Sequence, residues 1–198
     1  MADATSAMYP VRDADFTGPL PPIQAYGVTL SRLAEADLEL VRSWRNRPEI
    51  RDYMVHREYI TEEMQRRWFA SINNRYNFYS VIHYDGQAIG LSHTKNVDWT
   101  TMVGEGGMMI WSREHQNSAV PFLAALLGTD WMFGKFGLQA IVGRVLKTNK
   151  RALRYDRALG YVFETPDPSS ETVIGRLTPE SYERATKALR TVLTAQST

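Results

Sequence analysis

The sequence contains no cysteine, and its positive and negative charges almost cancel. Without cysteine it has neither a disulfide framework nor a thiol nucleophile. The formal net charge of +1 gives no overall attraction to nucleic acid. No apolar run approaches the roughly 18 residues that a membrane span needs, and the N-terminus lacks a secretory signal. We therefore expect a soluble, cytoplasmic protein with neither a nucleic-acid nor a membrane partner.

A metal site is also not expected. The four histidines are dispersed, without a pair at helical ligand spacing and without an acidic partner at metal-ligand spacing. They are His56, His83, His93 and His115.

The composition is that of one folded domain. Of 198 residues, 43% are hydrophobic and 11% aromatic, which suffices for a substantial core. Residues 1–25 hold four prolines and little periodicity, so they are predicted to form a flexible N-terminal extension or a strap lying over the domain. Residues 26–178 form the predicted main domain. Residues 179–198 are predicted to be a C-terminal helix that packs on this domain or on a partner subunit, in a monomer or a homodimer.

Apolar periodicity and turn residues predict an α/β fold. Strands alternate with helices, and the Asp85-Gly86 dipeptide between two apolar runs predicts a tight hairpin. The sheet is therefore expected to be mixed and mostly antiparallel, with about seven strands flanked by helices. The predicted strands cover residues 28–33, 78–83, 87–93, 106–111, 140–146, 161–163 and 172–177. The predicted helices begin at Asp37, Thr61, Ser118, Asn149 and Thr178.

The segment from Val145 to Glu164 is the most informative. It combines a strand, a capping Asn149, a basic amphipathic helix, a stop at Gly160 and an aromatic strand. This segment closely resembles the closing segment of the GCN5-related N-acetyltransferases, the GNAT superfamily. In that family a helix between two splayed strands receives the pantetheine and nucleotide of acetyl-CoA. The element order also agrees, and the resemblance covers Val28 to Leu177.

The stretch Trp44-Arg45-Asn46 resembles the first-helix signature of a GNAT subgroup that acetylates amino sugars carried on nucleotides. The similar enzymes of pseudaminic acid biosynthesis, which serve flagellin glycosylation, act on a UDP-linked 4-amino-4,6-dideoxy sugar. Ribosomal-protein N-acetyltransferases share the broader pattern. Guanidinium groups suit phosphate oxygens, although clustered arginines also occur on ordinary solvated faces. The resemblance implies that Arg45 and Asn46 contact the substrate or order the site. It implies these substrate-binding residues: Trp44, Arg45, Asn46, Arg51 and Met54.

The family binds acetyl-CoA with an Arg/Gln-x-x-Gly-x-Gly/Ala loop that leads into a helix, where backbone amides face the pyrophosphate. Here Gln116 fits, but Ala119 replaces the first glycine and Pro121 the second small residue, which removes one amide donor. The alternative is a helix start that has lost its ligand. The resemblance implies these residues for the acetyl-CoA cosubstrate: Met109, Ile110, Trp111, Gln116, Asn117, Ser118, Ala119, Val120, Asn149, Ala152 and Tyr155.

The catalytic residues depart from the family pattern. Where relatives carry a tyrosine that protonates the leaving thiolate, this chain has Asp156, which serves as an acid only if burial raises its pKa. An ordered water or another tyrosine is the alternative. Ser92, in Ser92-His93-Thr94-Lys95, aligns with a serine near the sugar amine in relatives, and strand alternation then points His93 away from the site. Glu105 is the second candidate base.

Together these features predict direct N-acetyl transfer from acetyl-CoA to a nucleotide-linked amino sugar. A protein N-terminus or another small amine is the rival substrate. A third possibility, a non-catalytic binding module of the same fold, is suggested by Ala119, Pro121 and Asp156.

Overall fold

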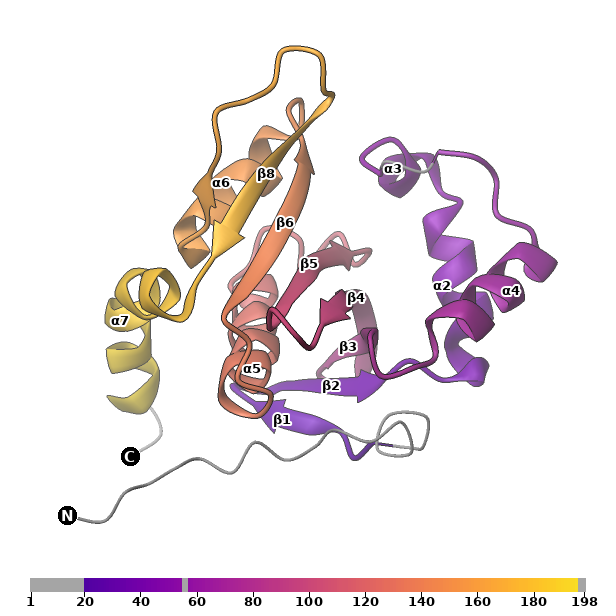
Figure 1. The fold of residues 1–198 in the computed structure, drawn as a ribbon. Helices are drawn as coiled ribbons and strands as arrows, with labels where there is room; N and C mark the ends of the chain where they lie inside the picture. The colour runs from indigo at the N-terminus through magenta and orange to yellow at the C-terminus, as the bar shows by residue number, and fades with distance from the viewer. Residues whose placement is uncertain (1–19, 55–56, 196–198) are drawn as a thin grey trace.

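A mixed sheet runs through the computed structural model, which describes residues 20–54 and 57–195 (Figure 1). Within these residues the sheet has eight strands in the order β1-β2-β3-β4-β5-β6-β8-β7. Neighbouring strands are antiparallel except β5 and β6, which are parallel. The predicted α/β fold with a mostly antiparallel sheet is confirmed, with one strand more than expected. The strands are β1 (Ile23–Ala25), β2 (Val28–Arg32), β3 (Phe78–Tyr84), β4 (Gln87–Asp98), β5 (Val103–Ile110), β6 (Ala140–Leu146), β7 (Val162–Phe163) and β8 (Thr172–Leu177).

The additional strand corrects the predicted N-terminal boundary. Ile23–Ala25, assigned from its sequence to a flexible extension, forms β1 and pairs with β2. A turn at Tyr26 and Gly27, both with positive φ, connects the two strands. The ordered sheet therefore begins before residue 26. Residues 1–19 of the predicted extension and residues 196–198 lie outside the described residues, as does His56.

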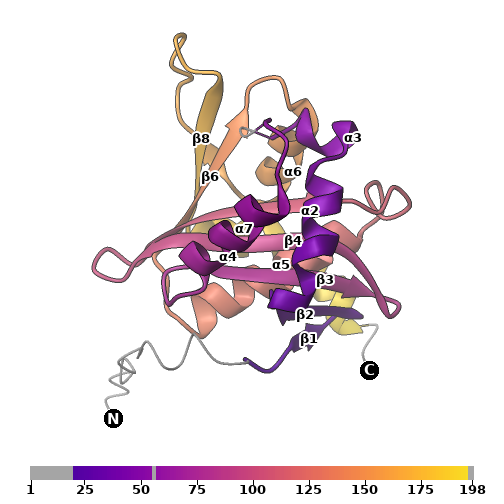
Figure 2. The same cartoon turned by 90° about the vertical axis from the view of Figure 1, so that its right-hand side faces the viewer.

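The helices lie on both faces of the sheet, and Figure 2 shows α2 and α4 in front of the strands with α5 behind them. Tyr79, Leu91 and Met109 belong to one core with α2 and α4, which we call the α2–α4 face. Ile82 and Met108 belong to a second core with α5, which we call the α5 face. The helices are α2 (Leu38–Arg45), α3 (Pro48–Arg51), α4 (Glu62–Ile72), α5 (Val120–Gly134), α6 (Lys150–Leu159) and α7 (Pro179–Ala195), after a short 3₁₀ helix at Glu35–Asp37.

Most local signals in the sequence have the predicted role. The Thr61 hydroxyl accepts from Met64 N, and Asn149 Oδ1 accepts from Ala152 N, so both residues cap their helices. Gly160 ends α6 with φ +106°. The prediction for Asp37 was wrong in detail: its carboxylate accepts from Ala34 N and stabilises the 3₁₀ turn before α2.

Helix α7 packs on its own domain. The Tyr182 hydroxyl donates to Asp130 Oδ1 at 2.9 Å and to the Leu126 carbonyl at 3.1 Å, both on α5. Arg190 also forms an ion pair with Asp130. Among the described helices, none has both the length and the apolar character needed to cross a membrane.

The strand register creates an opening in the middle of the sheet. The parallel pairing of β5 with β6 ends at Gly106 and Gly143. Beyond this pair, β5 continues against β4 and β6 continues against β8, so the two strands separate. The free edge of β5 therefore faces a gap that connects the two faces of the sheet.

Candidate active site

Tyr161 lies across the two glycines at which β5 and β6 separate. A Cβ atom added at Gly143 would lie 3.1 Å from Tyr161 Cε1, and one added at Gly106 would lie 3.1 Å from the Tyr161 hydroxyl oxygen. Glycine at both positions therefore leaves room for the tyrosine ring. The hydroxyl consequently lies over β5 at the base of the opening, on the face that carries α6.

His93 occupies the corresponding position on the other face of β5. A Cβ atom at Gly107 would lie only 2.6 Å from His93 Cε1, and the imidazole stacks on Tyr79 at 5.0 Å between ring centroids. Because adjacent residues of a strand face opposite sides, Gly106 and Gly107 admit a phenol on one face and an imidazole on the other. His93 and Ser92 face opposite sides of the sheet, as strand alternation predicts, but His93 lines the cavity and does not point away from the site.

A cavity of about 280 Å³ extends along this opening. Its wall includes Tyr161 and the predicted site residues Asn149, Ala152, Tyr155 and Asp156. The closing helix α6 thus brings its predicted residues together beside the gap between β5 and β6.

Asp156 is a cavity residue whose acidity is strongly altered. Burial raises the pKa of this carboxyl to about 7. Its side chain makes no hydrogen bond or ion pair with any residue in the described parts of the chain. Burial, and secondarily the nearby Asp156 charge, raises the pKa of both Tyr155 and Tyr161. The condition set from the sequence, that burial must raise the pKa of Asp156, is met.

Tyr155 lines the same cavity, but its hydroxyl is engaged in the fold. It donates to the Pro121 carbonyl at 2.7 Å, and its ring packs edge-on against Phe122. Tyr155 therefore joins α6 to the first turn of α5. Its contribution to a cofactor site is limited to the ring.

In the predicted phosphate loop before α5, some backbone amides already donate to acceptors within the loop. Ser118 N donates to the His115 carbonyl at 3.1 Å, and Val120 N donates to Ser118 Oγ at 3.2 Å. Among the described residues, the amides of Asn117 and Ala119 have no acceptor. These two N–H groups and the start of α5 can receive a phosphate, so the loop fits a CoA pyrophosphate with fewer amide donors than the family pattern supplies.

Gln116 fixes this loop between β5 and α6. Its Nε2 donates to the Ile110 carbonyl at 2.9 Å, while Arg151 donates to its backbone carbonyl and to its Oε1. The side chain of Gln116 therefore shapes the loop through protein contacts. Ile110 packs on the α5 face and Met109 on the α2–α4 face.

Trp111, predicted to contact the cofactor, lies instead in the core beneath α2. It leaves the sheet after β5 ends at Ile110, and it is only 3% exposed. Its Nε1 donates to the Ala88 carbonyl at 2.8 Å, and its ring stacks on Trp44 at 6.0 Å. Arg47 covers the other side of this pair, 3.7 Å from the Trp44 ring centroid.

Arg45 is a largely enclosed cation without an acidic partner among the described residues. Its guanidinium lies 5.2 Å from the Trp68 ring centroid, and its buried Nε has no hydrogen-bond partner. Burial lowers the pKa of Arg45. A guanidinium of this kind is suited to an anionic ligand group.

Glu105 is the one carboxylate on β5. It forms an ion pair with Lys95 at 3.1 Å. Burial, then the charges of Lys95 and Arg45, lowers the pKa of His93 to about 3, so its imidazole is neutral at physiological pH.

The two predicted bases lie on opposite faces of the sheet. Ser92 is opposite Ser80 and Met108 in the strand register, which places it on the α5 face. Glu105 is two residues before Gly107 and shares the α2–α4 face with His93. The structure therefore does not bring Ser92 and Glu105 together.

Asn46, predicted to contact substrate or to order the site, makes protein contacts. Its side-chain amide bonds both backbone groups of Ile60. Met54 packs against the core beneath α2. Arg51, three residues earlier in the chain, is half-buried.

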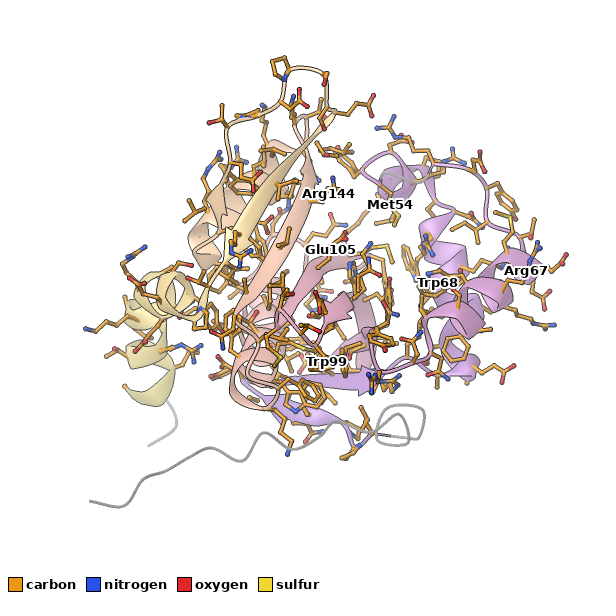
Figure 3. The ribbon with its side chains drawn as sticks, in the orientation of Figure 1. Met54, Arg67, Trp68, Trp99, Glu105 and Arg144 are labelled. Carbon is orange, nitrogen blue, oxygen red and sulfur yellow. The ribbon has the colours of Figure 1, made fainter. Side chains whose placement is uncertain are left out.

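Arg144 and Tyr161 were missed from the sequence. The register pairs Val142 with Glu105, so Arg144, two residues further along β6, shares the α2–α4 face. In Figure 3, Arg144 and Met54 project from opposite sides into the space between β6 and α3. Two features of the sequence could have identified these residues. Arg144 follows a glycine within the strand β6, and Tyr161 directly follows the glycine that ends α6.

In the described parts of the chain, no group of three or more histidine and carboxylate side chains is arranged to hold a metal ion.

A family model described as an acetyltransferase (GNAT) domain matches residues 28–162. No protein of curated function matches the sequence.

Several solved structures share the fold at low sequence identity. FdhC, described as a nucleotide-linked sugar GNAT, is 18% identical over 85% of this chain and 96% of its own, with a TM-score of 0.72. Spermidine N-acetyltransferase from Vibrio cholerae, solved with CoA and spermine, is 18% identical over 80% of this chain and 99% of its own, with a TM-score of 0.70. A domain from Methanocaldococcus jannaschii is 18% identical over 76% of this chain and 97% of its own, with a TM-score of 0.67.

Proposed function

This chain belongs to the GNAT acetyltransferase family, and from that premise we propose that it acetylates the amino group of a nucleotide-linked amino sugar. The acetyl donor is acetyl-CoA, which the family uses. The acceptor is a sugar of the UDP-4-amino-4,6-dideoxy type, as in pseudaminic acid pathways.

The observation that carries this proposal is the excess of unpaired cations on the α2–α4 face. Arg45 has no acidic partner among the described residues, whereas Glu105 is already paired with Lys95. Arg144 and Arg176 lie on the same face. Glu105, Val142 and Arg176 are opposite one another across β5, β6 and β8, and Arg144 is two residues after Val142 on β6. Guanidinium groups match the oxygens of a diphosphate.

The same charges disfavour a polyamine as the acceptor. A polyamine carries several ammonium groups and needs unpaired carboxylates around it, because like charges repel. The Vibrio cholerae relative was solved with spermine, but its similarity to this chain is one of fold. A nucleotide-linked sugar, as described for FdhC, agrees better with the arginines.

The reaction proceeds by direct transfer across the opening between β5 and β6. Acetyl-CoA approaches from the α5 side, with its phosphates at the Asn117 and Ala119 amides and its thioester near Gly106. The acceptor amine approaches from the α2–α4 face and attacks the thioester carbonyl carbon. Glu105, on this face, accepts the amine proton through water. Ser92, on the opposite face, contributes only to the donor side.

Acetyl-CoA titration followed by an acceptor comparison tests the proposal. Calorimetry measures acetyl-CoA binding, and a thiol reagent then measures CoA release with a UDP-4-amino-4,6-dideoxy sugar, spermidine or an N-terminal peptide. Because the protein has no cysteine, the reagent reports only CoA. We expect the highest kcat/KM with the sugar nucleotide. A higher value with spermidine or the peptide would contradict the acceptor assignment, and binding without any transfer would favour a non-catalytic module.

A further inference from the structure

We propose that Tyr161 donates the proton that the departing CoA thiolate takes up, and that the Asp156 carboxyl in the same cavity restores the proton of this phenol through water. This inference rests on the proposed function, because it assigns a role within acetyl transfer. It replaces the sequence-based assignment of Asp156 as the direct acid.

The position of the Tyr161 hydroxyl is the first argument. It lies over Gly106, the last residue of β5 that pairs with β6. An amine on the α2–α4 face and a thioester on the α5 side can meet only where the two strands separate. The hydroxyl is therefore at the point of the fold where the C–S bond must break.

The second argument is that the fold does not use this hydroxyl. Among the described residues, the Tyr161 hydroxyl has no hydrogen-bond partner. The hydroxyls of Tyr155 and Tyr182, by contrast, donate to the Pro121 carbonyl and to Asp130. Tyr161 lines the cavity, so its hydroxyl is available to a ligand atom there, whereas phenylalanine would fill the same space between the glycines without offering this group.

The end of α6 fixes Tyr161 beside Asp156. Tyr161 N donates to the Asp156 carbonyl at 3.0 Å through the left-handed turn at Gly160. A Cβ atom at Gly160 would lie 2.5 Å from the Ser181 carbonyl oxygen of α7, so this turn cannot move outward. Both side chains line the same cavity.

The acidities of the two groups agree with their assigned roles. Burial raises the pKa of Asp156 to about 7, so its protonated form is present near neutral pH. The raised pKa of Tyr161 keeps the phenol protonated before the reaction. The charge of Asp156 also acts on Tyr155, a titratable group on the same helix. No basic side chain of the described residues forms an ion pair with this carboxyl.

The proton balance is complete with these groups. The amine nitrogen forms the C–N bond, and the C–S bond then breaks with its electron pair going to sulfur. Sulfur takes the Tyr161 proton, the phenolate takes the proton of the Asp156 carboxyl, and Asp156 regains a proton from solvent. The ammonium proton leaves to the base on the α2–α4 face. The products are an amide and a thiol, and no oxidant or further reactant is needed.

Tyr161→Phe, compared with Tyr182→Phe outside the cavity, tests the role directly. We expect kcat to fall by about 10²- to 10⁴-fold in Tyr161→Phe, the range for loss of general acid catalysis. The calorimetric Kd for acetyl-CoA should stay close to that of the wild type. Tyr182→Phe loses structural hydrogen bonds to α5 and should retain most of its kcat.

Asp156→Asn gives a second readout that does not depend on Tyr161→Phe being well folded. In the wild type, kcat should decrease as pH rises through about 7, because Asp156 loses the proton that it must supply. In Asp156→Asn this decrease should be absent and kcat uniformly low. An unchanged profile in this variant would overturn the role of Asp156.

The outcomes separate this inference from the proposed function. Normal kcat in Tyr161→Phe, with an active wild type, would overturn the inference and leave the function standing. A large loss of acetyl-CoA binding in Tyr161→Phe would assign Tyr161 a structural role and also overturn it. If the wild type transfers acetyl to none of the three acceptors, both fail.

Discussion

Asn46 holds Ile60 by both of its backbone groups. Its Nδ2 donates to the Ile60 carbonyl at 2.8 Å, and its Oδ1 accepts from Ile60 N at 2.8 Å. Ile60 immediately precedes Thr61, the cap of α4. The end of α2 is thereby fixed to the start of α4, and this relationship maintains the space in which Arg45 lies over Trp68. Of the two roles predicted for Asn46, substrate contact and ordering of the site, these bonds favour the second.

Asn46→Ala should separate these two helices. Two hydrogen bonds are lost and Ile60 N loses its acceptor, although the Ile60 carbonyl keeps the bond from Arg42, so unfolding should become easier by about 1–3 kcal/mol. The acceptor KM should rise, while the acetyl-CoA Kd should change little. Chemical denaturation and kinetics measure these effects, with Ser43→Ala as the control, because Ser43 bonds only within its own helix. An increase confined to the acetyl-CoA Kd would contradict this role.

Arg45→Lys should weaken the acceptor selectively. Lysine keeps the charge but loses the planar group that stacks on Trp68, and hydrogen bonds to charged groups contribute about 1.5–3 kcal/mol. The KM for the UDP-amino sugar should therefore rise about tenfold or more. Arg47→Lys is the matched control, since Arg47 is exposed and stacks on the outer side of Trp44. Equal effects of both substitutions would argue against a specific anion site at Arg45.

Features that depend on neighbouring residues were predictable from the sequence. The Thr61 and Asn149 caps, the Gly160 stop and the Asp85-Gly86 turn each follow from local backbone chemistry. The strand and helix order followed from apolar periodicity and from the family resemblance.

Features that depend on distant residues were not predictable. Trp111 lies in the core because it meets Trp44 and Ala88, and neither contact follows from its own neighbours. The position of Tyr161 depends on Gly106 and Gly143, which meet only because β5 and β6 pair in parallel. The sequence therefore showed that Asp156 replaces the tyrosine of the family pattern. Only the strand register shows that Tyr161 lies at the opening beside it.

Gly143→Ala should disturb Tyr161 without removing its hydroxyl. The added Cβ would lie 3.1 Å from Tyr161 Cε1 and 3.5 Å from Cδ1, so the ring must shift away from β6. Such overpacking costs about 1–3 kcal/mol of stability. The kcat should fall with it because the hydroxyl moves. Gly134→Ala is the control, since nothing lies within 4 Å of its added Cβ, and it should leave kcat unchanged. A Gly143→Ala enzyme with full kcat would show that the position of the ring does not matter.

Asp156→Asn should change how stability depends on pH. The raised pKa of Asp156 determines the direction of this change. The pKa of this carboxyl is about 7 in the folded protein, against an ordinary value of 3.8. Folding therefore favours the protonated form, so its stabilising effect is complete below pH 4 and is lost as pH rises toward 7. The difference between 3.8 and about 7 corresponds to at most roughly 4 kcal/mol above both values.

Asparagine cannot ionise, so the variant should escape this loss. Denaturation curves from pH 4 to pH 8 should show similar stabilities at the acid end and a growing advantage of Asp156→Asn toward pH 8. Asp98→Asn is a control of opposite sign, because hydrogen bonds from Thr100 and Thr101 lower the pKa of Asp98. That carboxylate stabilises the fold at neutral pH, and its contribution disappears as pH falls through its folded pKa. If the wild type and Asp156→Asn kept a constant difference across the whole range, Asp156 would titrate as an ordinary exposed carboxyl, and its part in restoring the Tyr161 proton would have no physical basis.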